Sequence, residues 1–171
     1  MKKQWFAAIP LLLMFLFLPM MAGAIEVGAE APDFELMTVD GVKVHLSDYK
    51  GQFIILKLAT TWCPTCKQQT QEFRADKDFL KENKIQIVDV FVQDSEAMVK
   101  KYIKGMAEEL PYVALLDDSS ALRAYNVYLI PRVLLIDPDF KVRRDGSLMS
   151  AKELRTTLTE MIQNREKEKH P

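Results

Sequence analysis

Two cysteines, three positions apart, directly follow an apolar segment, and this arrangement constrains the fold more than any other feature of the chain. Residues 53–58 read FIILKL, the near-continuous hydrophobic pattern of a strand that is covered on both faces. Pro64 lies where the first residue of a helix would stand, a position that proline tolerates well. The pattern therefore predicts a strand, a short loop, and a helix that has Cys63 at its start and Cys66 one turn further on.

Strand and helix patterns alternate along the rest of the chain. Buried strands are expected at residues 85–92, 112–116 and 132–136, and a turn at 137–140 leads into a returning strand at 141–144. Helices are expected from Pro64 to about residue 83, from Ser95 to about residue 109 and from Ser150 to about residue 164, with short helical turns at 47–51 and 118–125. Two N-terminal strands, at 31–34 and from Val42 onward, are joined by a turn. This order predicts an α/β fold with a mixed central sheet flanked by helices.

The first 24 residues have the pattern of a secretory leader. Lys2 and Lys3 precede an apolar stretch over residues 5–21, and Ala22-Gly23-Ala24 places small residues at the −3 and −1 positions of a cleavage site. We expect a signal peptide at 1–24, one domain at 25–164 and a charged, frayed tail at 165–171. The alternative is an uncleaved N-terminal membrane anchor. Both alternatives place the domain outside the cytoplasm, in the periplasm or an equivalent compartment.

The two thiols are better suited to redox chemistry than to stapling the fold. A disulfide stabilises most when it closes a long loop, and this pair closes a very short one. Together with His45 and His170, the thiols do not form a set of four zinc ligands, so no metal or other cofactor is expected. The net charge of −1, without a basic stripe, gives no reason to expect a nucleic-acid partner.

The position of each thiol predicts its role. Backbone amides at a helix N-terminus favour an anion, so Cys63 is expected to be acidified and to act as the nucleophile. Cys66 is then the resolving thiol, which attacks Cys63 and releases the substrate. Pro64 and Thr65, between the sulfurs, are expected to tune the pair. Trp62 either packs into the core beside the sulfur or forms part of a docking surface.

Four segments carry a resemblance to a known family. They are residues 28–34 (GAEAPDF), 46–51 (LSDYKG), 62–66 (WCPTC) and the Ile130-Pro131 dipeptide before the strand at 132–136. Over about residues 27–163 the chain resembles thioredoxin-fold proteins of the TlpA/ResA type, related to DsbE/CcmG. The resemblance implies a thioredoxin-like fold with an N-terminal β-hairpin and a helix–strand insertion over residues 94–125. It also implies that Pro131 is a cis proline facing the disulfide.

The same resemblance implies the function and the partners. The family consists of extracytoplasmic thiol–disulfide oxidoreductases, and this chain is expected to work as a reductant. The implied client is a disulfide-bearing protein such as apocytochrome c. The implied electron donor is a thiol reductant in the membrane, because the compartment itself is oxidising.

Three positions depart from the family pattern. Gln69 stands where a glutamate is usual, and only Glu72, expected at the surface, could replace that charge. Lys57 stands where an aspartate or asparagine is usual. It either extends to solvent or is buried below the site, where its ammonium would favour a thiolate. Arg132 follows Pro131, where a small hydroxyl residue is common, and it is expected to add positive charge near Cys63, to select an acidic client, or to point outward. Gln69 and Lys57 together are expected to lower the pKa of Cys63.

Two other functions compete with the reductant interpretation. Peroxiredoxin-type peroxidases share the fold and the Ala-Pro-Asp-Phe segment, and Thr60 matches their T-x-x-C pattern, but Leu56 stands where they carry a proline. A metallochaperone on the same scaffold would need a C-x-x-x-C pair and a distant histidine, which this sequence lacks.

Overall fold

A seven-stranded mixed sheet forms the centre of the protein, in the order β2-β1-β5-β4-β3-β6-β7. The computed structural model describes residues 25–169, so the expected signal peptide at 1–24 and His170 lie outside the described part. The strands are β1 (Glu35–Thr38), β2 (Lys43–His45), β3 (Ile54–Ala59), β4 (Gln86–Phe91), β5 (Tyr112–Leu116), β6 (Arg132–Ile136) and β7 (Val142–Gly146). Strands β3, β4 and β5 are parallel, and the remaining pairs are antiparallel. The predicted α/β class with a mixed sheet is confirmed.

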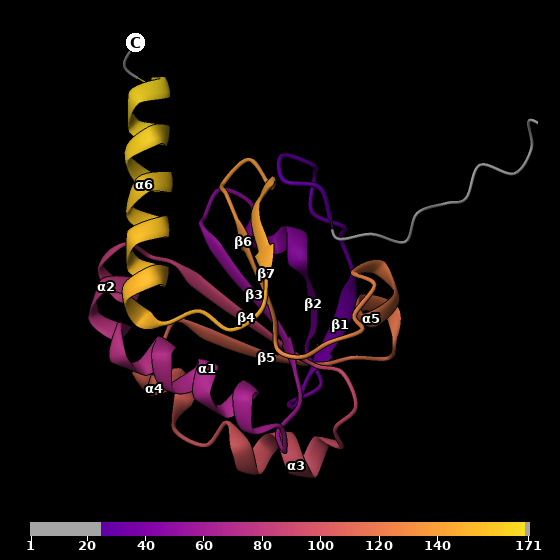
Figure 1. Ribbon diagram of the computed structural model, residues 1–171. Coiled ribbons are helices and arrows are strands. Elements are labelled where there is room, and N and C mark those ends of the chain that lie inside the picture. The colour runs from indigo at the N-terminus through magenta and orange to yellow at the C-terminus, as the bar shows by residue number, and fades with distance from the viewer. Residues whose placement is uncertain (1–24, 170–171) are drawn as a thin grey trace, which may run out of the picture.

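Helices cover both faces of this sheet (Figure 1). They are η1 (Leu46–Tyr49), α1 (Pro64–Ala75), α2 (Lys77–Glu82), α3 (Glu96–Tyr102), α4 (Met106–Glu109), α5 (Ser120–Ala124) and α6 (Ala151–Lys169). One core lies under α1, α2 and α6 and includes Phe73, Leu80 and Leu158. The core on the opposite face is closed by η1 and α5, with Leu46 and Tyr125 among its members. Among the described residues, no helix is both long and apolar enough to cross a membrane.

Two of the predicted helices are interrupted. The helix expected from Pro64 to residue 83 breaks at Asp76, whose backbone N–H bonds to Phe73 and Arg74 rather than continuing the regular pattern. The buried Asp76 carboxylate is instead bound by Arg155 from α6. The helix expected up to residue 109 breaks at Gly105, which adopts a left-handed conformation (φ 81°) that favours glycine. The hydrophobic periodicity of the sequence does not reveal these breaks. The first coincides with the contact between Asp76 and the distant Arg155, and the second with the left-handed backbone of Gly105.

The chain ends also differ from the expectation. Residues 31–34 are not a strand; the N-terminal hairpin is formed by β1 and β2, and only Glu30 makes an isolated bridge, to Lys141. Helix α6 runs on to Lys169, past the expected end near residue 164. Arg165, expected in a frayed tail, instead forms an ion pair with Asp139 in the β6–β7 turn.

Strand β3 positions the cysteine pair. All six of its residues are buried, because β4 and β6 flank it and helices cover both faces. Its side chains alternate, so Leu56 enters the core under η1 and α5 whereas Ile55 enters the core under α1. At its carboxyl end Ala59 packs against both cysteines. The strand therefore brings the chain to the N-terminus of α1 at the edge of the parallel strands, where sites in α/β sheets usually lie.

Candidate active site

Cys63 is the N-cap residue of α1, and its sulfur accepts a hydrogen bond from a backbone N–H in the first turn of that helix. The Cys66 backbone N–H donates to Cys63 Sγ at 3.4 Å, and Thr65 Oγ1 lies 3.1 Å from the same sulfur. Pro64, at the first helical position, has no N–H to satisfy there. Cys63 is 7% exposed, whereas Cys66 is fully buried and both are free thiols. Cys63 therefore keeps a small exposed area, whereas Cys66 has none.

The two thiols differ in acidity. Burial raises the pKa of Cys63, but hydrogen bonds to its sulfur from Cys66 and Thr65 outweigh burial and lower the pKa overall. Burial also raises the pKa of Cys66, and the hydrogen bond to Cys63 and the negative charge on that residue raise it further, to about 12. The Thr60 backbone and the Lys57 ammonium act in the opposite direction on Cys66. At neutral pH Cys63 is thus the better nucleophile and Cys66 holds its proton.

The loop before Cys63 is fixed by a residue that sequence reasoning missed. Asp94 accepts hydrogen bonds from the Thr61 backbone at 2.7 Å and from the Thr61 hydroxyl at 2.6 Å. Asp94 follows β4, so its carboxylate ties the ends of two neighbouring parallel strands together. This bidentate contact holds the segment that carries Trp62 and Cys63.

A buried polar network lies below the thiols. Lys57, only 1% exposed, forms an ion pair with Asp89 at 2.7 Å and donates to Thr70 Oγ1 at 2.8 Å. The Thr70 hydroxyl donates to the carbonyl of Cys66, and the Tyr112 hydroxyl donates to Asp89. The expectation that Lys57 extends to solvent is wrong, because Asp89 lies directly opposite it in the β3–β4 register and compensates its charge.

This network was not foreseen, although one signal was present in the sequence. Asp89 interrupts the apolar run of residues 85–92, just as Lys57 interrupts that of residues 53–58. Two opposite charges at matching positions of adjacent parallel strands indicate a buried pair. In the structure the Lys57 ammonium opposes, to a small extent, the rise in the pKa of Cys66. Its expected effect on the pKa of Cys63 stays a prediction.

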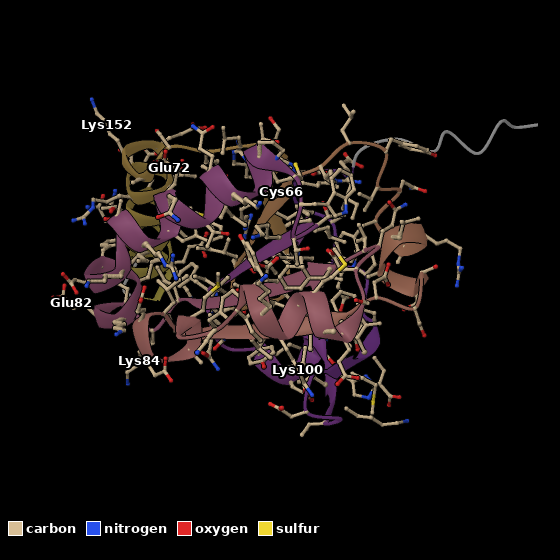
Figure 2. All side chains as sticks on the ribbon, turned by 90° about the horizontal axis from the view of Figure 1, so that it is seen from below. Cys66, Glu72, Glu82, Lys84, Lys100 and Lys152 are labelled. Carbon is tan, nitrogen blue, oxygen red and sulfur yellow. The ribbon has the colours of Figure 1, made fainter. Side chains whose placement is uncertain are left out.

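Gln69 is buried and links two segments of the fold. Its amide accepts from the Met149 backbone N–H at 2.7 Å and donates to the Met149 carbonyl at 3.2 Å. Glu72, one turn further on, accepts from the Ala151 N–H at the start of α6, so it is not a free surface charge. Figure 2 shows Cys66 near the start of α1 and Glu72 further along the same helix. The contacts of Gln69 are structural, and its expected tuning of the thiols stays a prediction.

Arg132 is held inside the protein, so two of the three alternatives for it, selecting an acidic client and pointing outward, are wrong; an added positive charge near Cys63 stays a prediction. Its guanidinium forms an ion pair with the buried carboxylate of Asp145 and donates to the Asn126 carbonyl at 3.1 Å. Only 11% of its side chain is exposed, so it neither points outward nor offers a free charge to a client. The preceding Ile130–Pro131 bond is cis, as the resemblance implied.

The surface beside Cys63 is apolar. Trp62 is 56% exposed, so the interpretation that it packs into the core is wrong. Tyr128 and Leu129, just before Ile130-Pro131, are 77% and 84% exposed. Ile130 itself packs against Cys63 and Cys66, which connects this loop to the site. In the described part of the chain, no group of three or more His, Cys, Asp or Glu side chains is placed to hold a metal ion.

The fold and the thiol pair together define a thioredoxin-like thiol–disulfide oxidoreductase. The AhpC/TSA family profile matches residues 27–145, and the chain belongs to that family. The thiol–disulfide oxidoreductase ResA of Bacillus subtilis is 34% identical over 119 residues, which are 70% of this chain and 66% of that protein. The match therefore spans about two thirds of that relative's length.

Solved structures agree with this fold. The thioredoxin domain of a thiol–disulfide oxidoreductase from Bacteroides vulgatus superposes with a TM-score of 0.70 at 22% identity, over 81% of this chain and 99% of that one. The exposed lipoprotein thioredoxin of Streptococcus pneumoniae gives a TM-score of 0.62 at 29% identity, over 75% of this chain and 99% of that one. The predicted thioredoxin-like fold and family resemblance are confirmed.

The acidity difference predicts selective labelling of the reduced protein. Iodoacetamide pulses between pH 6 and pH 10 should modify Cys63 with an apparent pKa below that of an ordinary cysteine. Cys66 should stay unmodified across this range, because a thiol with a pKa of about 12 is almost entirely protonated there. Peptide mass spectrometry measures both. Equal labelling of the two cysteines at pH 8 would contradict the assignment.

The buried lysine predicts a slower resolving step when it is removed. Lys57→Met is made together with Asp89→Asn, so that no unpaired charge is left in the core. Without the ammonium the pKa of Cys66 should rise. Attack by Cys66 on a Cys63–glutathione disulfide should then slow by about three- to fourfold for each pKa unit, because the smaller thiolate fraction is partly offset by a more nucleophilic thiolate.

Glutathione release, followed by mass spectrometry, measures that step. Lys67→Met is the matched control, because Lys67 is adjacent to Cys66 in sequence but exposed. An unchanged release rate in the double variant, or an equal loss in the control, would show that the buried charge has no part in resolution.

Proposed function

We propose that this protein is an extracytoplasmic thiol–disulfide oxidoreductase that works as a reductant of protein disulfides. The observation that supports the chemistry best is the asymmetric pair at the start of α1, in which Cys63 is acidified and slightly exposed whereas Cys66 is fully buried and has a raised pKa. The leader pattern at 1–24 supports export. The likeness to an exposed lipoprotein thioredoxin is consistent with a position outside the cytoplasm.

The reaction follows from the two sulfurs. The Cys63 thiolate attacks one sulfur of a client disulfide; that S–S bond breaks, and the departing client thiolate takes a proton from solvent. A mixed disulfide between Cys63 and the client remains. Cys66 then loses its proton and attacks Cys63, which releases the second client thiol and leaves a Cys63–Cys66 disulfide. Two electrons have passed to the client, and a donor dithiol must return them.

The charge on Cys63 affects when Cys66 can lose its proton for the resolving step. In the free reduced protein, both the hydrogen bond to Cys63 and its negative charge raise the pKa of Cys66. Once Cys63 is bound in a mixed disulfide, that negative charge is gone, and Lys57 remains below. The pKa of Cys66 should then fall. A larger fraction of Cys66 is therefore ionised when a client is bound to Cys63 than in the free reduced protein.

The surroundings of the site support a protein client, and the family resemblance suggests which client and electron donor these are. Trp62 in the loop before α1, and Tyr128 and Leu129 in the loop before β6, are exposed and suited to contact the apolar side chains of a protein client. We assign apocytochrome c, whose haem-binding cysteines must be reduced, as the client, and a thiol reductant in the membrane as the electron donor. With the leader retained, the same domain would be tethered to the membrane.

The redox state of the pair in intact cells tests the direction of the reaction. Cells are quenched with acid, and free thiols are labelled with a maleimide that changes the mass of the protein. A reductant with an active donor should have Cys63 and Cys66 mostly reduced. A pair that is mostly oxidised in growing cells would instead indicate an oxidase, and the reductant proposal would fail.

Single-cysteine variants test the roles of the thiols. The probe is an oxidised Cys-Ala-Ala-Cys-His peptide, which carries the haem-attachment spacing. Cys66→Ser should accumulate a covalent adduct with this peptide, whereas Cys63→Ser should form little, because the remaining thiol is buried. The reverse pattern would overturn the assignment. Rapid consumption of hydrogen peroxide by the native protein, without reaction with the peptide, would favour the peroxidase alternative.

The apolar surface predicts a further effect on the same adduct. Leu129→Ser should slow adduct formation by the Cys66→Ser protein several-fold while leaving its reaction with a small disulfide unchanged. Val42→Ser is the control, because Val42 is also an exposed aliphatic residue, 58% against 84% for Leu129, but lies next to β2 at the edge of the sheet. Equal rates for the Leu129 and Val42 variants would remove this loop from the docking surface.

A further inference from the structure

The first residue that the structure describes, Ile25, is anchored by its backbone nitrogen. This nitrogen donates to Asp145 Oδ2 at 3.0 Å, across 120 positions of sequence. The Ile25 side chain packs against the core closed by η1 and α5. Three residues later, Gly28 N–H donates to the Val142 carbonyl at 2.7 Å. The start of the domain is thus fixed along β7 by main-chain and side-chain contacts.

The group that accepts this hydrogen bond is the buried carboxylate of Asp145, which is also bound by Arg132. The Asp145 side chain is 5% exposed, and Arg132 binds it through two nitrogens, with Nε donating to Oδ1 at 2.8 Å. Arg132 also donates to the Asn126 carbonyl, which fixes the guanidinium in place. Three donors therefore surround one carboxylate, a number that its two oxygens can accept. Because the site is shielded from water, charges placed here interact strongly.

The nitrogen that donates to Asp145 is also the one that leader removal would release. The pattern Ala22-Gly23-Ala24 predicts cleavage between residues 24 and 25. Hydrolysis of that peptide bond consumes one water, leaves a carboxylate on Ala24, and leaves an amine on Ile25 that is protonated at neutral pH. An amide N–H at Asp145 would then become an ammonium in the same place.

We propose that removal of the leader completes a buried ion cluster, in which the new α-ammonium of Ile25 pairs with Asp145 beside Arg132. The bond from Ile25 becomes charge-assisted and hence roughly twice as strong as the neutral bond it replaces. The cluster joins the new N-terminus, the first residue of β6 and a residue near the end of β7. The processed protein is therefore more stable than one with residue 24 still attached. The inference rests on export, which is part of the proposed function, but not on the thiol chemistry.

The first experiment establishes where the mature chain begins. The full chain is expressed with export, and the intact mass of the purified protein is measured. A loss of residues 1–24 is expected. A chain that keeps these residues, or that is cut elsewhere, would overturn the proposal. Thiol exchange is measured on the same sample, so that failure of the redox proposal is recognised separately.

The second experiment isolates the charge. Part of the mature protein is unfolded in urea at pH 6.5, acetylated at its α-amine and refolded; acetylation keeps the Ile25 N–H but removes the charge. Urea titration should give an equilibrium constant for unfolding about fivefold larger for the acetylated form, because its bond from Ile25 to Asp145 is a neutral hydrogen bond rather than a charge-assisted one. Equal unfolding constants for the two forms would overturn the proposal.

A pair of variants links the effect to the cluster. Asp145→Asn should abolish the difference between the free and acetylated N-termini. Because this variant leaves Arg132 buried without its partner and can fail to fold, Arg132→Met/Asp145→Met is prepared alongside it. A difference that persists in whichever variant folds would show that the amine acts elsewhere, and would contradict the pairing.

Discussion

The hydrogen bond from the Cys66 amide to the Cys63 sulfur is the contact on which the chemistry of this protein depends. It exists because β3, buried on both faces, delivers the chain to the N-terminus of α1 with a cysteine in the capping position. Free amides at a helix N-terminus stabilise an anion, by about 0.3–1 kcal/mol at a surface. The same helix turn carries Cys66 inward, where burial keeps its proton in place. One local geometry therefore produces two thiols of opposite character.

The buried Lys57–Asp89 pair is costly to place below this site, because both charges are removed from water. Part of the cost is offset by hydrogen bonds that reach Thr70, Tyr112 and, through Thr70, the carbonyl of Cys66, although Asp89 Oδ1 has no partner among the described residues and burial still raises the pKa of Asp89. A hydrophobic pair could fill the same space, but it would give no electrostatic help to a resolving thiol that must lose its proton. The ammonium is among the groups that oppose the rise in the pKa of Cys66, which is the basis for proposing a functional role for the pair.

Much of the fold followed from local sequence, because its strands are continuous apolar runs and its helices have clear starts. The position of the cysteine pair at the start of a helix and the lowered pKa of Cys63 were also predicted, since helix position affects thiol acidity, while the roles of the two thiols stay predictions. What the sequence did not reveal were contacts between distant residues. Asp76 breaks a helix because Arg155 binds its carboxylate, and Arg132 is unavailable to a client because Asp145 holds it. The sequence left open whether Lys57 extends to solvent or is buried, because its partner Asp89 lies 32 positions away on the neighbouring strand.

The central claim is that the negative charge on Cys63 adds to the effect of burial in raising the pKa of Cys66. It is tested most directly by measuring the pKa of Cys66 from its ¹³Cβ chemical shift, in the reduced protein and again with Cys63 held in a disulfide with glutathione. A Cys66→Ala/Cys63–glutathione sample identifies the signals, and short measuring times limit resolution of the disulfide. The account predicts a pKa of about 12 in the reduced protein and a clearly lower value in the mixed disulfide. An unchanged pKa would contradict it.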